Sequence, residues 1–297
     1  MHRVLLNQGV ATGVEVTGAD GQPATIRAGR VIVAAGAYHS PALLQRSGIG
    51  AADQLRGLGA EVIADRPGVG QHLLDHACVQ LDFQGRPGLT SELAAQTWNP
   101  DEQTVGRARS TRCDDGPYDI HVFMVAGANS GHPGLPPISL YGGAMRAISA
   151  GQVTITSAGP DANPAVDHRY GTDPGGHDRA VLAEALELLR QMTRDPGLRD
   201  VLGAEHQPGR DPLASIVSYC HPAGTCKMGP ASDPGAVVGA TGAVHGLDGL
   251  YVCDASIMPD ITRGNINLPT AMIGARVAAG LLGLDPAQAT ADLIHQS

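Results

Sequence analysis

An apolar run at residues 31–35, Val-Ile-Val-Ala-Ala between Arg30 and Gly36, constrains the fold more than any other stretch. A run without polar interruptions predicts a strand buried on both faces, as in parallel sheets. Such a strand needs a parallel neighbour joined to it by a crossover connection. Because no strand–helix–strand unit precedes residue 31, we expect this strand to lack its neighbour and to leave apolar surface and strand edges open.

The other patterns predict an α/β (α+β) chain that also contains antiparallel sheet. Turn residues at 18–21 separate short apolar segments and predict a small hairpin unit before residue 31. Longer segments further on predict a second, mostly antiparallel sheet. The polar residues 84–117 are expected to form a surface loop or a lid. The expected strands are residues 4–6, 10–16, 24–27 and 61–64, then 78–83, 118–126, 138–148, 152–157 and 250–253.

Helices are predicted where capping residues and apolar periodicity coincide. Ser40 is a candidate N-cap with Pro41 in the first turn, and that helix should end near residues 47–50. A short helix is expected at 52–58, and apolar residues at helical spacing predict an amphipathic helix at 178–192. The last helix opens inside Asn-Leu-Pro-Thr at 267–270 and stops before Gly283.

Composition excludes several classes of function. The formal charge is −9, whereas binding to nucleic acid requires clustered Lys and Arg to neutralise phosphates. No apolar run reaches the roughly 18 residues that a membrane span needs. The five cysteines form no CxxC pair, which favours free thiols in a reducing cytoplasm. We therefore expect a cytoplasmic protein that has no membrane-spanning segment and does not bind nucleic acid.

The first stretch with chemical potential surrounds His221, in Cys-His-Pro-Ala-Gly-Thr-Cys at residues 220–226. A histidine beside proline in a glycine-containing turn is held at a fixed place in a loop, where it could act on a substrate or merely occupy the turn. Cys220 and Cys226 raise the possibility of zinc. The five-residue gap between them and the missing second ligand pair argue against a metal site.

The second stretch, residues 250–276, predicts a strand, a polar loop and a helix. Such a unit suits a site built at the carboxyl end of a strand. Asp254 ends the strand and Asn265 lies in the loop, but each could equally be a structural residue, and Asn267 suits the role of helix cap. Ser149 faintly resembles a hydrolase nucleophile turn, but it lacks the first glycine and leads into a strand rather than a helix.

Six sequence blocks occur in order along residues 36–274. They are Gly-Ala-Tyr-His-Ser-Pro-Ala-Leu-Leu-Gln-Arg-Ser-Gly-Ile-Gly at 36–50, Pro-Gly-Val-Gly-Gln-His-Leu-Leu-Asp-His at 67–76, and the segments 164–170, 221–229, 251–256 and 264–274. Together they resemble the glucose–methanol–choline (GMC) flavoprotein oxidoreductases, and the first block is similar to the family's second signature. In the second block, His72 and Leu74 replace the family's usual Asn and Gln.

The resemblance implies FAD as cofactor and a small alcohol as substrate, as in choline-dehydrogenase-like enzymes. His221 matches the family's catalytic base, which takes the hydroxyl proton while the carbon loses hydride to flavin N5. Asn265 matches the second active-site residue, which hydrogen-bonds the substrate oxygen. The resemblance further implies that the flavin is bound by Asp254, Ala255, Asn265, Ile266, Asn267 and Thr270.

The same resemblance implies that one segment is missing, because the chain has no GxGxxG after a strand to hold the ADP half of FAD. We expect an incomplete Rossmann-like FAD-binding domain at 1–76, an antiparallel-sheet substrate domain at 77–215 and a returning FAD-binding segment at 216–297. Two alternatives to an active enzyme stay open: a truncated, inactive fragment, and one half of a split enzyme that needs a partner chain.

Overall fold

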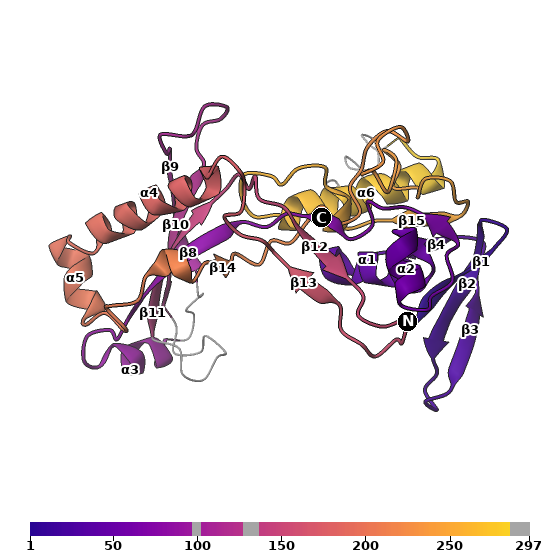
Figure 1. Cartoon of the computed structure of the whole chain (residues 1–297). Helices are drawn as coiled ribbons and strands as arrows, with labels where there is room; N and C mark the ends of the chain where they lie inside the picture. Colours follow the sequence, from indigo (N-terminus) through magenta and orange to yellow (C-terminus); the bar gives the residue numbers. More distant parts are fainter. Residues whose placement is uncertain (97–101, 127–136, 286–297) are drawn as a thin grey trace. The chain divides into compact units, whose positions relative to one another are not determined.

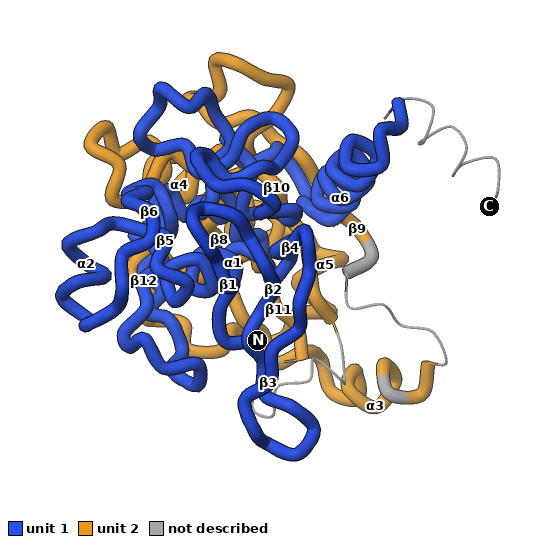
Figure 2. The backbone as a smooth tube through the Cα atoms, turned by 90° about the vertical axis from the view of Figure 1, so that its right-hand side faces the viewer, with its two compact units in different colours: residues 1–75, 150–169, 221–297 blue, residues 76–149, 170–220 orange. Residues whose placement is uncertain are grey.

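The computed structural model describes residues 1–96, 102–126 and 137–285, which form two compact units (Figure 2). Unit 1 comprises residues 1–75, 150–169 and 221–297, and unit 2 comprises residues 76–149 and 170–220. The fold is α/β, with helices and mainly antiparallel sheets (Figure 1). The division into functional domains at residues 76 and 215 remains a prediction.

The first three strands of unit 1 form the predicted hairpin sheet. β1 pairs antiparallel with β2, and β2 pairs antiparallel with β3. The connection between β2 and β3 closes where the Gly18 N–H donates to the Gln22 carbonyl over 2.7 Å. The bounds are β1 Arg3–Asn7, β2 Val10–Thr17 and β3 Pro23–Arg27.

The apolar run after this hairpin does have a parallel neighbour, so the expectation that it would lack one is wrong. β4 (Val31–Val33) pairs in parallel with β15 (Leu250–Val252). The partner comes from the last quarter of the chain rather than from a preceding strand–helix–strand unit. Val31 and Val33 are buried, whereas Ile32 between them is 48% exposed. The prediction that both faces of this strand are buried is therefore also wrong, because the face that carries Ile32 is exposed.

The helix after β4 begins earlier than predicted. α1 (Gly36–Arg46) starts directly after the strand, with Ala35 as its N-cap residue and Pro41 inside it. Ser40 is consequently not a cap: its hydroxyl accepts the Ala35 N–H at 3.0 Å and donates to Asp254. The bounds of the other elements in unit 1 are β5 Ile49–Gly50, α2 Ala52–Gly57, β6 Ala64–Asp65, β7 Gln71–Leu73, β12 Gly151–Thr154, β13 Ala165–Asp167, the 3₁₀ turn η2 Ala255–Ile257 and α6 Asn267–Leu282.

Unit 2 is built on a five-stranded sheet in the order β14-β8-β11-β10-β9, with α4 packed on it (Figure 1). The predicted apolar face of α4, which includes Val181, Ala185 and Leu189, is buried. Gly142 on β11 permits this close approach, because a Cβ there would lie 3.0 Å from the Ala185 Cβ. The bounds are β8 Ala77–Phe83, α3 Leu89–Ala94, β9 Glu102–Ala108, β10 Ile120–Ala126, β11 Ile138–Ala144, α4 His177–Met192, α5 Pro196–Leu202, the 3₁₀ turn η1 Pro212–Ala214 and β14 Val217–Ser218.

Two sequence-based assignments around this sheet are wrong. Residues 84–117 are not simply a loop, because they contain α3 and β9, and β9 pairs with β10. Residues 97–101 of that stretch lie outside the described part. β12 does not join the large sheet and instead pairs with β7 and β13 in unit 1. The periodicity of a segment identifies it as a strand but does not determine which other strand it pairs with.

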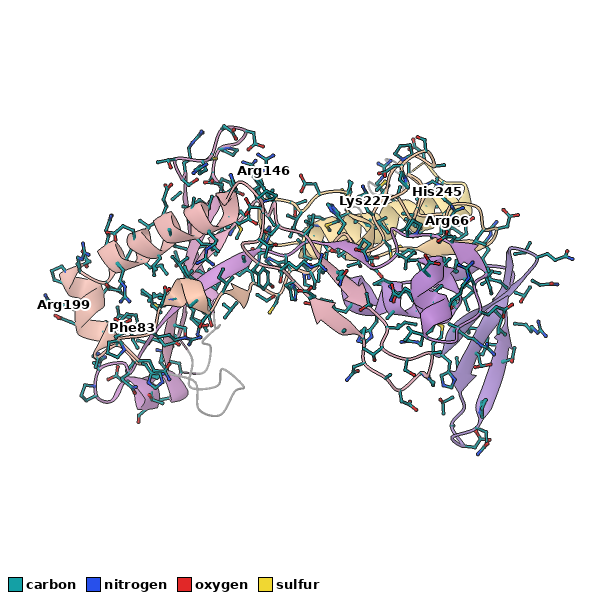
Figure 3. The ribbon with its side chains drawn as sticks, viewed as in Figure 1. Arg66, Phe83, Arg146, Arg199, Lys227 and His245 are labelled. Carbon is teal, nitrogen blue, oxygen red and sulfur yellow. The ribbon has the colours of Figure 1, made fainter. Side chains whose placement is uncertain are left out.

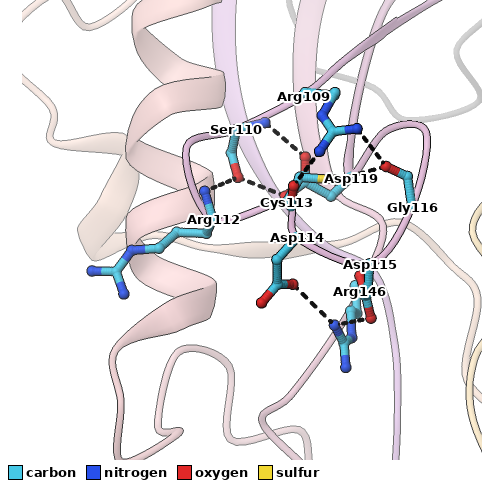
Figure 4. A network of polar contacts seen from close by, with 9 residues as sticks. All are labelled: Arg109, Ser110, Arg112, Cys113, Asp114, Asp115, Gly116, Asp119 and Arg146. Atoms are coloured by element: carbon cyan, nitrogen blue, oxygen red, sulfur yellow. Dashed lines mark hydrogen bonds and ion pairs between the residues drawn. The ribbon is translucent and has the colours of Figure 1, made fainter.

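The turn between β9 and β10 is fixed by polar contacts within it and with Arg146 (Figure 4). The carboxylate of Asp119 accepts hydrogen bonds from the backbone N–H and the hydroxyl of Ser110, at 2.8 and 2.6 Å. The guanidinium of Arg109 donates to the carbonyls of Cys113 and Gly116, and Arg146 pairs with Asp115. These contacts order a polar segment that has little apolar surface to bury.

Polar contacts also fix the long connection between residues 227 and 245 in unit 1. Arg66, which lies beside His245 (Figure 3), donates to the His245 carbonyl at 2.9 Å. Lys227 pairs with Asp233 at 2.9 Å. All five cysteines are free thiols. Within the described residues, no helix combines the length and the apolar character that crossing a bilayer requires.

Candidate functional site

The loop that begins at His221 is held against η2 by a ladder of backbone hydrogen bonds. The N–H groups of Gly224, Cys226 and Met228 donate to the carbonyls of Ala255, Ser256 and Ile257, at 3.1, 2.8 and 2.9 Å. Alternate residues of an extended segment thus bond to successive residues of the turn. The two stretches singled out in the sequence, around His221 and around Asp254, therefore lie side by side within unit 1.

The opposite side of this loop contacts the segment around residue 73. Ala223 and Leu74 exchange both backbone hydrogen bonds, at 2.9 and 3.0 Å. Gly224 has φ +85°, and a Cβ there would lie 2.5 Å from the His72 carbonyl oxygen. Only glycine fits this position without strain. The backbone that follows His221 is thereby fixed between two neighbouring segments.

His221 itself is half-buried, and its backbone N–H donates to Oδ1 of Asp75 at 2.9 Å. Burial lowers the pKa of the imidazole below its usual value of 6.5, while the nearby Asp75 carboxylate acts in the opposite direction. The side chain is therefore mainly neutral at neutral pH and able to accept a proton. This property is the one required of a general base.

Asp254 is a buried connector between three segments. Its Oδ1 accepts the Ser256 N–H at 2.8 Å, and its Oδ2 accepts the Gly36 N–H at 2.9 Å and the Ser40 hydroxyl at 2.5 Å. The carboxylate thus joins the end of β15 to the start of α1. It also positions Ala255, which is buried and accepts the Gly224 N–H.

The start of α6 provides an exposed set of backbone and amide donors. The helix begins at Asn267, its N-cap residue is Ile266, and no side chain caps it, so the assignment of Asn267 as cap is wrong. Asn265 and Asn267 are exposed, whereas Ile266 is buried. Thr270 donates its hydroxyl hydrogen to the Ile266 carbonyl at 2.7 Å. α6 as a whole packs against η2, the same turn that the His221 loop contacts.

Sequence reasoning missed three residues of this neighbourhood: Asp75, His168 and Tyr38. Asp75 is 3% exposed, and its Oδ2 lies 3.7 Å from Nδ1 of His168. Nε2 of His168 is 3.1 Å from the Tyr38 hydroxyl. The available signal was the Asp75-His76 pair that ends the loop at residues 67–76, since an acidic residue directly after Leu73-Leu74 requires polar partners if it is buried with them.

The zinc alternative finds little support in the geometry. Cys226 is fully buried, and this burial raises the pKa of its thiol, so it remains protonated. Within the described ranges, no group of three or more His, Cys, Asp or Glu side chains is arranged to hold a metal ion. A cavity of about 390 Å³ lies at the hairpin sheet, bordered by His2, Arg46 and Glu61, and none of its lining residues was predicted as a site residue.

Comparison with known families decides the class of protein. Models described as GMC oxidoreductase match residues 1–78 and 147–274. The chain belongs to the GMC oxidoreductase family. It is 31% identical over 301 residues to oxygen-dependent choline dehydrogenase 1 of Chromohalobacter salexigens, covering 90% of this chain and 53% of the relative. Its identity to oxygen-dependent choline dehydrogenase of Cronobacter sakazakii is 34% over 317 residues, covering 96% and 56%.

Two solved structures share the fold of this chain. Pyridoxine 4-oxidase from Mesorbium loti superposes with a TM-score of 0.78 at 28% identity, over 96% of this chain and 57% of that protein. Formate oxidase of Aspergillus oryzae has the same fold, with a TM-score of 0.80 at 22% identity, over 93% and 58%. The chain spans about half the length of the curated relatives it matches. Membership places it among oxidoreductases.

FAD is the cofactor of GMC oxidoreductases, and the described residues fit one end of it. Without a side-chain cap, the Asn267 and Leu268 N–H groups have no acceptor inside α6, and the dipole of this 16-residue helix adds positive potential there. Such donors suit the oxygens and negative charge of a flavin ring. The sequence lacks the GxGxxG loop that would hold the ADP half, so the fit concerns the ring end alone.

Proposed function

We propose that this chain carries the catalytic segment of an FAD-dependent oxidoreductase that acts on the CH–OH group of an alcohol, with His221 as the base. The proposal depends mainly on one observation, the backbone ladder between the His221 loop and η2. This ladder fixes the loop that follows the half-buried His221 against the turn that α6 also contacts. Choline is the first substrate to test, because the relatives are choline dehydrogenases.

His221 would take the proton of the substrate hydroxyl. Burial lowers the pKa of its imidazole, which favours the neutral form that can accept a proton. As the proton arrives, the negative charge of Asp75 stabilises the imidazolium that forms. A base that is neutral before the reaction and stabilised in its charged form afterwards suits proton transfer near neutral pH.

Asn265 would hold the substrate oxygen by donating an amide N–H. A neutral amide orients an oxygen without competing for its proton, and it can strengthen its hydrogen bond as the oxygen becomes negative. The side chain is exposed on the loop before α6 and therefore open to a ligand. His221 and Asn265 would thus divide proton removal and oxygen binding between them.

The flavin ring would lie at the start of α6. FAD, when bound, supplies the acceptor for the hydride that leaves the alcohol carbon. Ile266, Asn267 and Thr270 would present backbone donors and a hydroxyl oxygen to the ring. Both Asp254 carboxylate oxygens already accept protein hydrogen bonds, so Asp254 would act mainly by holding Ala255 and its neighbours in place beside the cofactor chain.

A second candidate is a chain that needs another polypeptide segment to bind FAD, as half of a split enzyme. Unit 1 exposes large apolar side chains on α6, where Leu268 is 79%, Met272 57% and Leu282 73% exposed, and on β4, where Ile32 is 48% exposed. Such a surface favours cover by further apolar surface. A polypeptide with a strand, a GxGxxG loop and a helix would supply both this cover and the ADP site. A truncated, inactive fragment would present the same surface.

Flavin spectroscopy on the purified chain tests these proposals. The catalytic proposal expects a visible flavin absorption band after loading with FAD, and its bleaching on anaerobic addition of choline or another alcohol. His221→Gln should retain the band but slow bleaching by about 10²–10⁴-fold, the usual contribution of a general base. His206→Gln, a change of the same kind at a histidine in unit 2, should leave the rate unchanged. Equal bleaching rates in His221→Gln and the unmodified protein would refute the assignment.

The split-enzyme proposal expects a different pattern. The chain alone should give no flavin band, and a band should form after mixing with a polypeptide that carries the strand–GxGxxG–helix segment. Stoichiometric flavin in the isolated chain would contradict this proposal. A failure to bind flavin in either preparation would favour the inactive fragment.

A further inference from the structure

One buried carboxylate, Asp75, joins segments that are far apart in the sequence. Its side chain is fully buried and lies at the end of the loop that begins at residue 67. Oδ1 accepts the His221 N–H at 2.9 Å, and Oδ2 lies 3.7 Å from Nδ1 of His168, which follows β13. All three residues belong to unit 1.

His168 extends this arrangement to α1. Its Nε2 lies 3.1 Å from the hydroxyl of Tyr38, and the two rings meet edge to face with centroids 5.9 Å apart. The imidazole therefore has a carboxylate at one nitrogen and a phenol at the other. The hydrogen bond to Tyr38 orients the ring, and the Asp75 carboxylate is close enough to attract a proton held on Nδ1.

A buried carboxylate is costly unless its surroundings compensate for the lost hydration. The scaffold could have fixed the His221 backbone with a neutral acceptor such as the carbonyl of an asparagine. A charged group there has an additional effect, because Asp75 opposes the lowering of the pKa that burial imposes on both His221 and His168. The charge is thus shared by two imidazoles.

We propose that Asp75 is the positioning residue of the base: one oxygen fixes the backbone of His221, and the negative charge supports protonation of its ring in competition with His168. This inference depends on the proposed role of His221. A proton on His168 neutralises the shared carboxylate, so that His221 holds its own proton less well. His168 then acts as a second proton site that adjusts the strength of the base.

Other polar groups also lie near the two rings. Asp167 also raises the pKa of His168, but its carboxylate is paired with Arg169 at 2.9 Å. Tyr38 faces the far nitrogen of His168 with its hydroxyl. For His221, Asp75 is the charged group that acts on the pKa. A change at Asp75 should therefore be visible in both rings.

Proton NMR titration of the histidine rings in the full chain tests the proposal without requiring flavin or substrate. His221→Gln and His168→Gln assign the two signals. Asp75→Asn keeps a carbonyl acceptor but removes the charge, and it should lower the titration midpoints of both histidines, each by about 1 pH unit. Asp53→Asn removes an exposed carboxylate from α2 and should move neither signal.

His168→Gln leaves Asp75 intact and decides the outcome even if Asp75→Asn fails to fold. Removing the competing imidazole should raise the titration midpoint of His221, the direction opposite to that of Asp75→Asn. An unchanged His221 midpoint in His168→Gln, or in folded Asp75→Asn, would overturn the proposal. If flavin bleaching survives in His221→Gln while these NMR shifts occur, the proposed base is wrong but the shared carboxylate stands.

Discussion

Replacing Gly224 with alanine should destabilise the protein at the point where the His221 loop is fixed. Gly224 has φ +85°, and an added Cβ would lie 2.5 Å from the His72 carbonyl oxygen. Both atoms belong to backbone-anchored positions, since Ala223 and Leu74 beside them exchange hydrogen bonds. A flexible side chain cannot move aside to relieve this contact, so the loops themselves must separate.

The expected cost has two parts. Left-handed backbone geometry costs a non-glycine residue about 1–2 kcal/mol. Separating two packed segments to admit one extra carbon resembles overpacking of a core, which costs about 1–3 kcal/mol. The sum of about 2–5 kcal/mol is a large fraction of the ~5–15 kcal/mol that stabilises a typical native protein.

Urea denaturation followed by circular dichroism measures this cost. Gly224→Ala should unfold at clearly lower urea concentration with a similar slope. Gly280→Ala is the matched control, because its added Cβ meets nothing within 4 Å inside α6. Alanine is the better helix former, so this control should gain roughly 0.5–1 kcal/mol. Unfolding of Gly224→Ala at the midpoint of the unmodified protein would refute the reasoning.

Two further predictions concern unit 1. Ser40→Ala removes the 2.5 Å hydrogen bond to the buried Asp254 carboxylate. It should lower the free energy of unfolding by about 1.5–3 kcal/mol in the same denaturation assay. An unchanged midpoint would show that water replaces the hydroxyl. The hydrogen bond from Arg3 lowers the pKa of Glu15 below 4.5, so the ionised form stabilises the hairpin sheet above that pH, and the contribution is lost as the pH falls through the lowered folded-state pKa. Acid unfolding of Glu15→Gln should lack this small pH-dependent component, and a profile identical to that of the unmodified protein would contradict it.

Local sequence patterns correctly predicted those helices and strands whose conformation is determined by neighbouring residues. The hairpin sheet follows from turn residues at 18–21 and short apolar segments, and α4 follows from its apolar spacing. Gly283 ends α6 in the left-handed conformation, as its position predicted. In each case the neighbouring residues determine the backbone geometry, so a single sequence contains the necessary information.

Long-range pairing could not be predicted in the same way. The partner of β4 follows it by more than two hundred residues, and the pattern of either strand is compatible with many neighbours. The start of α1 was misplaced because the Gly36 N–H is satisfied by Asp254, a carboxylate from a distant segment. Ser40 resembled a cap for the same reason: its hydroxyl serves a tertiary contact.

In the candidate site, too, the sequence predicted local features but not long-range contacts. The sequence blocks identified the segments that carry His221 and Asn265, and the structure packs the His221 loop and α6, the helix after Asn265, against η2. Asp75 was overlooked because its importance arises from burial and from two partners, neither of which a single sequence reveals. The roles of the site residues remain proposals for the experiments above.

The pairing of β4 with β15 has a consequence for how the protein is made. Val31 and Leu250 are adjacent in the sheet but 219 positions apart (250 minus 31). At a synthesis rate of about 5–20 residues per second, the first strand leaves the ribosome roughly 10–45 s before its partner exists. During that interval the strand that contains Val31 and Val33 has no sheet partner. It can then bind chaperones or pair with strands of other nascent chains. Slower growth at low temperature with added chaperones is therefore expected to raise the soluble yield.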